Sequence, residues 1–170
     1  MEKLNSVFLS LGSDLENKIS NLKKAMLLIE LKIGPVVKTS SVYESEPWGF
    51  ESQTRFYNMA VELNSELSPQ ELLNATQSIE KQIGRSKKSS QSNYESRLID
   101  IDIIFYNDLI HSDTKLTIPH PLFQERNFVL YPLEEISPNK TDPITSFSVR
   151  QLMQNSPDTS EINVIKEYLL

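Results

Sequence analysis

The segment that most constrains the fold is residues 98–106 (LIDIDIIFY), in which apolar and polar side chains alternate. The apolar side chains at odd positions are Ile99, Ile101, Ile103 and Phe105. In a β-strand, alternate side chains share a face, so these four should turn together toward a core. The same alternation places Asp100 and Asp102 on the opposite face. The chain is therefore expected to build a sheet with one packed face and one face that carries two carboxylates.

Other apolar patterns place this strand last in an alternating series. Strands are predicted at residues 6–11, 36–43 and 56–63, and helices at residues 15–33 and 69–83. The first helix should follow a turn at residues 12–14, with Asp14 as its N-cap. Ser68, Pro69 and Glu71 form the capping box that opens the second helix, which should end at Gly84.

The order strand, helix, strand, strand, helix, strand is typical of one architecture. It predicts an α+β fold, a ferredoxin-like βαββαβ sandwich with an antiparallel sheet and helices on one face. The last third of the chain adds a short strand at residues 116–118, a segment at 128–133 and a helix near 148–154. These are expected to be C-terminal additions to a single domain over residues 1–170.

Composition narrows the possible functions. The chain has 170 residues, no cysteine and a net charge of −6, which excludes disulfides and thiolate sites and argues against a nucleic-acid surface. No apolar run is long enough to cross a membrane, so a cytoplasmic protein is expected. Basic residues nevertheless gather in one part of the chain, at Arg85, Lys87, Lys88, Arg97 and Arg126. This local basic region favours a small anionic ligand.

The two aspartates could hold a cation. Carboxylates two residues apart on a strand lie about 6.6–7 Å apart at the backbone and repel each other unless a cation lies between them. Magnesium uses one or two carboxylates together with substrate phosphates. An exposed strand face with two solvated acids is the alternative, and Arg97 together with the apolar neighbours Leu98 and Ile104 favours the metal site.

Several other polar or aromatic residues are ambiguous when each is taken alone. Asn58 could recognise a heterocycle edge but is more simply a turn-stabilising residue, and Trp48 could be a lid or a local core plug. Glu80 is more simply a solvated helix charge, and His111 a surface loop residue. His120, Arg126 and Phe128 could likewise have either a structural or a functional role.

Six motifs, in order over residues 7–138, resemble the family of 6-hydroxymethyl-7,8-dihydropterin pyrophosphokinases. They are LGSDLENK, SSVYESEPWG, FYNMAVEL, SPQELLNATQSIEKQIGR, RLIDIDIIFY and IPHPLFQERNFVLYPLEEISP. The resemblance implies a magnesium-dependent enzyme of folate biosynthesis, which moves the pyrophosphoryl group of ATP to the pterin and releases AMP. The expected partners are these small molecules, without nucleic acid or membrane, and the protein is expected to be a monomer.

The resemblance implies roles residue by residue. Asp100 and Asp102 match the family's ligands for two magnesium ions. The expected catalytic residues are these two with Arg85, Lys87 and Arg97. Pterin contacts are expected from Ser45, Pro47, Trp48, Phe56, Asn58, Tyr94 and Phe128. Contacts to ATP are expected from Glu80, Arg85, Lys87, Arg97, Ile103, His120 and Arg126, and the loops at residues 44–55 and 85–96 match mobile lids.

The chain departs from the family pattern mainly in one place. Asn93, Tyr94, Glu95 and Ser96 stand where a basic residue, Trp, Gly and Pro are usual, in a loop two residues longer. Tyr94 keeps a stacking face with less area, and Lys87 replaces a common Arg and so loses a bidentate fork. These changes put lid alignment and rate in doubt, while LGSD in place of LGSN should be neutral.

Two other functions stay open on the residues alone. The first is a non-catalytic ferredoxin-like module that senses a ligand and carries the aspartates as surface decoration. The second is a magnesium phosphohydrolase that uses the same D-x-D pair.

Overall fold

The computed structural model describes residues 4–47, 54–84, 98–166 and 169, and every structural statement below concerns these residues. The elements in chain order are β1 (Asn5–Ser13), α1 (Lys18–Lys32), β2 (Val36–Thr39), β3 (Val42–Ser45), β4 (Phe56–Ser65), α2 (Pro69–Ile83), β5 (Asp100–Tyr106), β6 (His111–Ser112), β7 (Thr117–Ile118), the 3-10 helix η1 (Phe123–Glu125), α3 (Asn127–Ile136), α4 (Val149–Gln154) and β8 (Ile162–Lys166).

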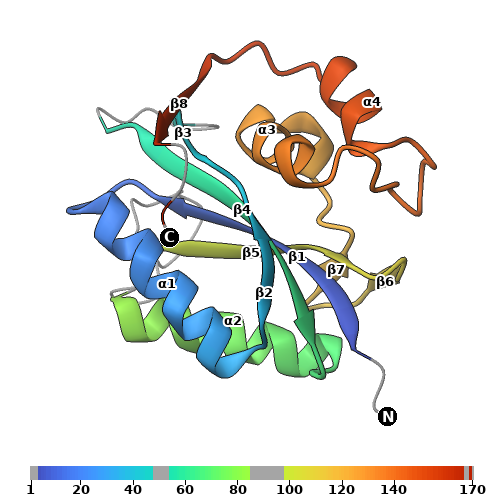
Figure 1. Ribbon diagram of the computed structural model, residues 1–170. Helices are drawn as coiled ribbons and strands as arrows, with labels where there is room; N and C mark the ends of the chain where they lie inside the picture. The colour runs from blue at the N-terminus through green and yellow to red at the C-terminus, as the bar shows by residue number, and fades with distance from the viewer. Residues whose placement is uncertain (1–3, 48–53, 85–97, 167–168, 170) are drawn as a thin grey trace.

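The main sheet is antiparallel and has the order β5-β1-β4-β3-β8, with β2 also paired to β4. This order confirms the predicted ferredoxin-like α+β fold, and Figure 1 shows the sheet crossing the middle of the molecule. The strand predicted at residues 36–43 is in fact two strands. It breaks at Ser40, whose hydroxyl accepts a hydrogen bond from the Ala60 N–H at 2.9 Å in place of a ladder carbonyl.

Helices cover both faces of the sheet, whereas the sequence predicted helices on one face only. Helices α1 and α2 lie side by side below the sheet in Figure 1, and α3 lies above it. The larger core, between the sheet and the helices α1 and α2, includes Leu9, Leu11, Leu22, Ile29, Met59 and Ile79. A second core between the sheet and α3 includes Phe8, Phe105, Phe123, Leu130 and Leu133. The segment at 128–133 is therefore helical because its apolar side chains cover the second face.

The N-cap of α1 is Asn17, and the prediction of Asp14 was wrong. Strand β1 continues to Ser13, whose hydroxyl donates to the carbonyl of Leu98 at 2.5 Å. Asn21 donates to the Ser13 hydroxyl at 3.1 Å and thereby fixes the helix against the end of the strand. Because β1 extends to Ser13, the chain changes direction after that residue, and α1 begins only at Lys18.

The predicted limits of α2 are confirmed. Ser68 accepts a hydrogen bond from the N–H of Glu71, and the Glu71 carboxylate accepts one from the N–H of Ser68, which completes the capping box. Gly84 ends the helix with φ of 126°, a conformation that favours glycine.

Strand β5 contains an irregularity that the alternating pattern did not reveal. Phe8 of β1 faces Phe105, while Leu9 faces Ile103, so Ile104 is an extra residue at a β-bulge. Beyond the bulge the alternation is displaced by one residue, and both Ile104 and Phe105 join the second core. The prediction that Phe105 shares a face with Ile103 was wrong, because the bulge lies between them.

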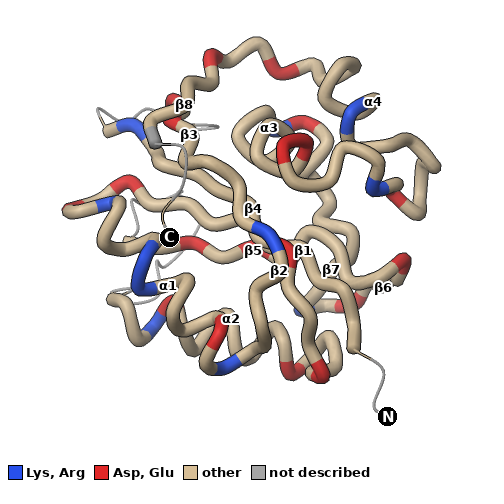
Figure 2. The backbone as a smooth tube through the Cα atoms, in the orientation of Figure 1, with Lys and Arg blue, Asp and Glu red and all other residues tan. Residues whose placement is uncertain are grey.

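The last part of the chain adds α4 and β8. The helix predicted near residues 148–154 is confirmed as α4, and Ser148 caps it through a second capping box. Strand β8 pairs with β3 at one end of the sheet. Figure 2 shows the acidic and basic residues interspersed along the described chain.

Candidate active site

Asp100 and Asp102 line a cavity on the α3 side of the sheet. Its described lining residues are Ser10, Gly12, Ser45, Glu46, Phe56, Asn58, Asp100, Asp102, Arg126 and Phe128. They come from β1, β3, β4, β5 and the start of α3, so the sheet supplies the floor and α3 one wall. We call this space the first cavity.

The neighbouring strand leaves room around both carboxylates. In the ladder between β1 and β5, Asp100 lies opposite Gly12 and Asp102 opposite Ser10. A Cβ atom at Gly12 would meet Asn58 Oδ1 at 3.2 Å, which is a tight contact. Small residues on β1 thus keep the floor of the cavity open between the carboxylates and Asn58.

Asn58 lies within strand β4 and is 2% exposed, so its interpretation as a turn-stabilising residue was wrong. Its Nδ2 donates to the hydroxyl of Ser45 at 2.7 Å. This bond fixes the amide plane at the cavity floor. An amide held in this way offers a hydrogen-bonding edge at a low cost in conformational entropy.

Arg126 and Phe128 form the α3 wall. The guanidinium carbon of Arg126 lies 5.7 Å from the centroid of the Phe128 ring, within cation–π distance. Arg126 is 6% exposed, and Phe128 packs against the second core. The wall therefore presents a positive charge beside an aromatic ring.

A second cavity lies between α2, β5 and the β6–β7 hairpin. Its described lining residues are Leu73, Ile101, Asp102, Ile103, Asp113, Thr114, Lys115, Leu116, Thr117, His120 and Pro121. Asp102 also lines the first cavity. Asp102 is therefore the residue of β5 that the linings of the two cavities share.

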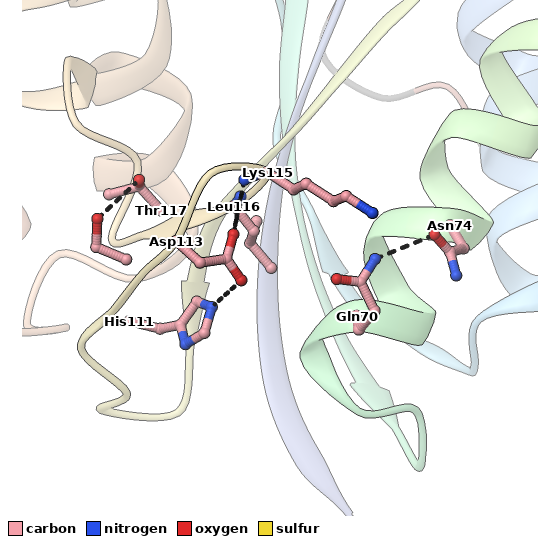
Figure 3. A network of polar contacts seen from close by, with 8 residues as sticks. Gln70, Asn74, His111, Asp113, Lys115, Leu116 and Thr117 are labelled. Atoms are coloured by element: carbon pink, nitrogen blue, oxygen red, sulfur yellow. Dashed lines mark hydrogen bonds and ion pairs between the residues drawn. The ribbon is translucent and has the colours of Figure 1, made fainter.

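The hairpin is shaped by Asp113. Its Oδ1 accepts hydrogen bonds from the N–H groups of Lys115 (2.7 Å) and Leu116 (2.8 Å), and its Oδ2 lies 2.9 Å from His111 Nε2. These hydrogen bonds, the two from the backbone first, lower the pKa of Asp113 to about 2. Figure 3 shows the resulting turn, from which the Lys115 side chain extends toward α2.

Sequence reasoning did not select Lys115 or Thr117. The polar run before residue 116 carries no periodicity that points to a site, and only the hairpin brings these side chains to Ile103 and His120. His111 begins β6 and contacts Asp113, so the prediction of a surface loop residue was wrong in its secondary structure.

His120 is held as a neutral imidazole. The N–H of Leu122 donates to its Nδ1 at 3.2 Å, so Nδ1 acts as an acceptor and the ring proton belongs on Nε2. Burial lowers the pKa of His120 to about 4; the nearby Arg126 lowers it too, and Asp100 opposes the shift. The second cavity therefore gains a polar side chain without a charge at neutral pH.

Glu80 supports the strand that carries the aspartates. It is 3% exposed, so its interpretation as a solvated helix charge was wrong. Its Oε1 accepts a 2.9 Å hydrogen bond from the N–H of Ile101, the residue between the two aspartates.

The other predicted residues are placed as follows. Pro47 is half-buried and is not among the described residues that line either cavity. Trp48, Arg85, Lys87, Tyr94 and Arg97 lie outside the described residues, as do Asn93, Glu95, Ser96, residues 48–53 of the first predicted lid and all of the second.

The donor set fits magnesium. The pair of carboxylates offers hard oxygen ligands, and both aspartates border the first cavity, where substrate phosphates could complete the coordination. No group of three or more His, Asp or Glu residues able to hold a metal occurs among the described residues. The described residues would therefore supply two carboxylates to a magnesium ion, and water or phosphate oxygens would complete its coordination.

The ferredoxin-like sheet places two carboxylates beside the first cavity, and one of them, Asp102, also lines the second, an arrangement that suits the class of transferases that act on two substrates. Within that class, the sequence matches the family of 7,8-dihydro-6-hydroxymethylpterin-pyrophosphokinases over residues 8–138, so the chain belongs to this family. Both the family prediction and the predicted enzyme class are confirmed.

Similar proteins support the assignment. The chain is 42% identical over 133 residues to the 2-amino-4-hydroxy-6-hydroxymethyldihydropteridine pyrophosphokinase of Porphyromonas gingivalis, covering 78% of this chain and 90% of that protein. It is 37% identical to the Bacillus subtilis enzyme of the same name, covering 86% and 87%.

Solved structures agree on the fold. The HPPK-DHPS of Plasmodium falciparum with pteroate superposes with a TM-score of 0.74 at 17% identity, covering 91% of this chain. The chain spans 44% of that larger protein. In the described part of this chain, no helix has the length and apolar character needed to cross a membrane.

Proposed function

We propose that the first cavity binds 6-hydroxymethyl-7,8-dihydropterin, that the second binds ATP, and that transfer occurs beside Asp102. The enzyme transfers the pyrophosphoryl group of ATP to the pterin in folate biosynthesis. The pterin hydroxyl oxygen bonds to the β-phosphorus, the bond from that phosphorus to the α-phosphate oxygen breaks, AMP leaves, and the hydroxyl proton is released. The observation that carries the proposal is that Asp102 borders both cavities.

The first cavity suits a flat heterocycle. Asn58 supplies an amide edge fixed by Ser45, and the rings of Phe56 and Phe128 border the same space. Aromatic faces beside a directional amide favour a planar ring that carries donors and acceptors at its rim. These contacts support pterin recognition by the described residues, to which the proposal adds Trp48, Pro47 and Tyr94.

The second cavity suits a nucleotide. Leu73, Ile103 and Leu116 give it apolar surface, while Lys115 adds a positive charge and the neutral His120 adds a hydrogen-bonding group. Arg126 faces the first cavity near the aspartates, where the phosphates would pass from one cavity to the other. The proposal assigns Arg85, Lys87 and Arg97 to the same phosphates, and Glu80 to the nucleotide side.

Two magnesium ions held by Asp100 and Asp102 would screen the phosphate charges and polarise the transferred group. The chain itself contributes the two carboxylates, the fixed backbone of β5 and the cation of Arg126. Because transfer of this kind asks a protein mainly for positioning and charge, no covalent nucleophile is needed.

The proposal also covers the setting of the reaction. Residues 1–170 act as one domain, and one copy suffices because a single chain lines both cavities. ATP is produced inside the cell, so the enzyme is assigned to the cytoplasm.

The reaction is tested by the nucleotide product. Purified protein is incubated with ATP, magnesium and 6-hydroxymethyl-7,8-dihydropterin, and nucleotides are separated by chromatography. AMP that appears only when all three are present is the expected result. ADP would indicate an ordinary kinase, phosphate release without pterin a phosphohydrolase, and ligand binding without turnover or magnesium dependence a sensing module.

A further inference from the structure

The chain beyond the region that matches the family contacts two walls of the first cavity. We call residues 155–166 the C-terminal arm. It leaves α4, passes above α3 and ends in β8 beside β3 (Figure 1). Neither Arg126 nor Ser45 belongs to the arm, but the arm binds the elements that carry both.

At one end, Asp158 caps α3. The N–H of Asn127 donates to Asp158 Oδ2 at 2.8 Å, and Asn127 Nδ2 donates to the Asp158 carbonyl at 2.8 Å. The N-cap residue of α3, Arg126, makes no side-chain cap, and the first turn has no acidic residue. Asp158 thus supplies, from 31 positions away, the acceptor and negative charge that a helix N-terminus favours.

Asp158 is itself fixed within the arm. Its Oδ1 accepts from the N–H of Ser160 at 2.9 Å, and its own N–H donates to the Ser156 hydroxyl at 3.2 Å. Both carboxylate oxygens are therefore engaged, one by the arm and one by α3. A carboxylate held from both sides sets the position of the helix start relative to the arm.

Four residues later, the arm becomes β8 and pairs with β3. Ser45 lies opposite Ile162, and Glu44 opposite Asn163. Ser45 holds the Asn58 amide at the cavity floor. The arm therefore connects the Ser45 side of the cavity to the start of α3, where Arg126 and Phe128 flank Asn127.

We propose that Asp158 is a positioning residue for the first cavity. By capping α3 it fixes Arg126 and Phe128 at a set distance from Ser45 and Asn58, so that the pterin ring fits between them. The inference rests on the proposed function for the identity of the ligand, but the contacts of Asp158 do not depend on it.

The test compares three variants of the full chain with the wild type. Asp158→Ala removes the cap, Asp158→Asn keeps one of the two acceptor oxygens, and Glu161→Ala removes another acid from the arm, one that is exposed. Measurements are the steady-state KM values for pterin and ATP, the calorimetric Kd of 6-hydroxymethylpterin, and amide hydrogen exchange at residues 127–130.

Asp158→Ala is expected to raise the pterin KM and Kd about five- to tenfold and to speed exchange at residues 127–130 by a similar factor, the usual effect of losing a cap. The KM for ATP should change less than the KM for the pterin, because Ile103, Lys115 and His120 lie on other elements and only Arg126 among the described ATP contacts lies at the start of α3. Asp158→Asn should restore part of the pterin affinity, because its one oxygen can still accept from Asn127 whereas its amide nitrogen cannot accept from Ser160. Glu161→Ala should match the wild type.

A folded Asp158→Ala protein with wild-type pterin Kd and KM would overturn the inference. So would an equal loss in Glu161→Ala, which would indicate general loosening of the arm. If the wild type binds the pterin but releases no AMP, the proposed function fails, and the role of Asp158 is still decided by the Kd and exchange values.

Discussion

Glu80 on α2 accepts a buried hydrogen bond at 2.9 Å from the backbone N–H of Ile101, the residue between the two site aspartates. Among the strands that the structure describes, β5 is at the edge of the main sheet and pairs with β1 alone. A buried N–H on the open side of such a strand needs an acceptor from elsewhere, and α2 provides it. The positions of Asp100 and Asp102 therefore depend on a helix side chain as well as on the sheet.

Replacing Glu80 with Ala should leave the Ile101 N–H without this acceptor. We expect a loss of about 1–3 kcal/mol in the free energy of unfolding and a lower kcat, because the strand carrying the aspartates is less fixed. Glu80→Gln keeps a carbonyl oxygen and should lose less on both measures. Chemical denaturation and steady-state kinetics check this, and Glu80→Ala with unchanged stability and kcat would contradict it.

Replacing Gly12 with Ala should narrow the first cavity. The added Cβ would lie 3.2 Å from Asn58 Oδ1 and 3.9 Å from Phe56 Cδ1, so the Asn58 amide must shift. We expect the pterin KM to rise about tenfold, in the range that overpacking costs. The KM for ATP in the same protein is the internal control, and an equal rise in both KM values would show that the effect is not local to the pterin cavity.

Replacing Asp113 with Ala should act on the other substrate. Without its carboxylate the N–H groups of Lys115 and Leu116 lose their acceptor, and the hairpin wall of the second cavity loosens. We expect the KM for ATP to rise about three- to tenfold, as for the loss of one or two hydrogen bonds, with little change for the pterin. Asp108→Ala, which removes an exposed acid paired with Lys140 at 2.7 Å, is the matched control and should have no effect.

His120 should stay neutral down to pH 5. Its pKa of about 4 in the folded protein lies below the ordinary value of 6.5. Between these values the unfolded chain binds more protons, so stability should fall as the pH drops from about 6.5 toward 4 and should not depend on His120 above that range.

Nuclear magnetic resonance measures this directly, because the chain has only two histidines. In a His111→Gln protein the one remaining imidazole signal belongs to His120. We expect no titration of this signal near pH 6.5. A midpoint between pH 6 and 7 would show that His120 is solvated and would remove it from the wall of the second cavity.

Local chemistry explains why much of the fold was predictable. The capping box at Ser68 and the glycine at position 84 define α2 through contacts within a few residues. The alternation in β5 likewise placed Asp100 and Asp102 on the face away from the larger core. These features depend on residues close together in the chain, so they can be read from the order of residues in the sequence.

Features that depend on distant partners were not predictable from local pattern. The bulge at Ile104 arises from the register between β5 and β1, and α3 covers the second face because Phe8 and Phe105 meet it there. The burial of Glu80 follows from the open edge of β5, and the place of Lys115 follows from the hairpin that Asp113 shapes. The first three features depend on contacts between residues far apart in the chain. The fourth depends on a turn whose sequence has no apolar periodicity.

The central claim is that Asp100 and Asp102 act as a pair in magnesium-dependent pyrophosphoryl transfer. It is tested by AMP release in Asp100→Asn and Asp102→Asn proteins, with ATP, pterin and a range of magnesium concentrations, after thermal denaturation has shown that each variant folds. We predict that either substitution lowers kcat by about a thousandfold or more, the scale on which a lost electrostatic group acts, while the melting temperature changes by only a few degrees. Wild-type AMP release by both folded variants would contradict the account.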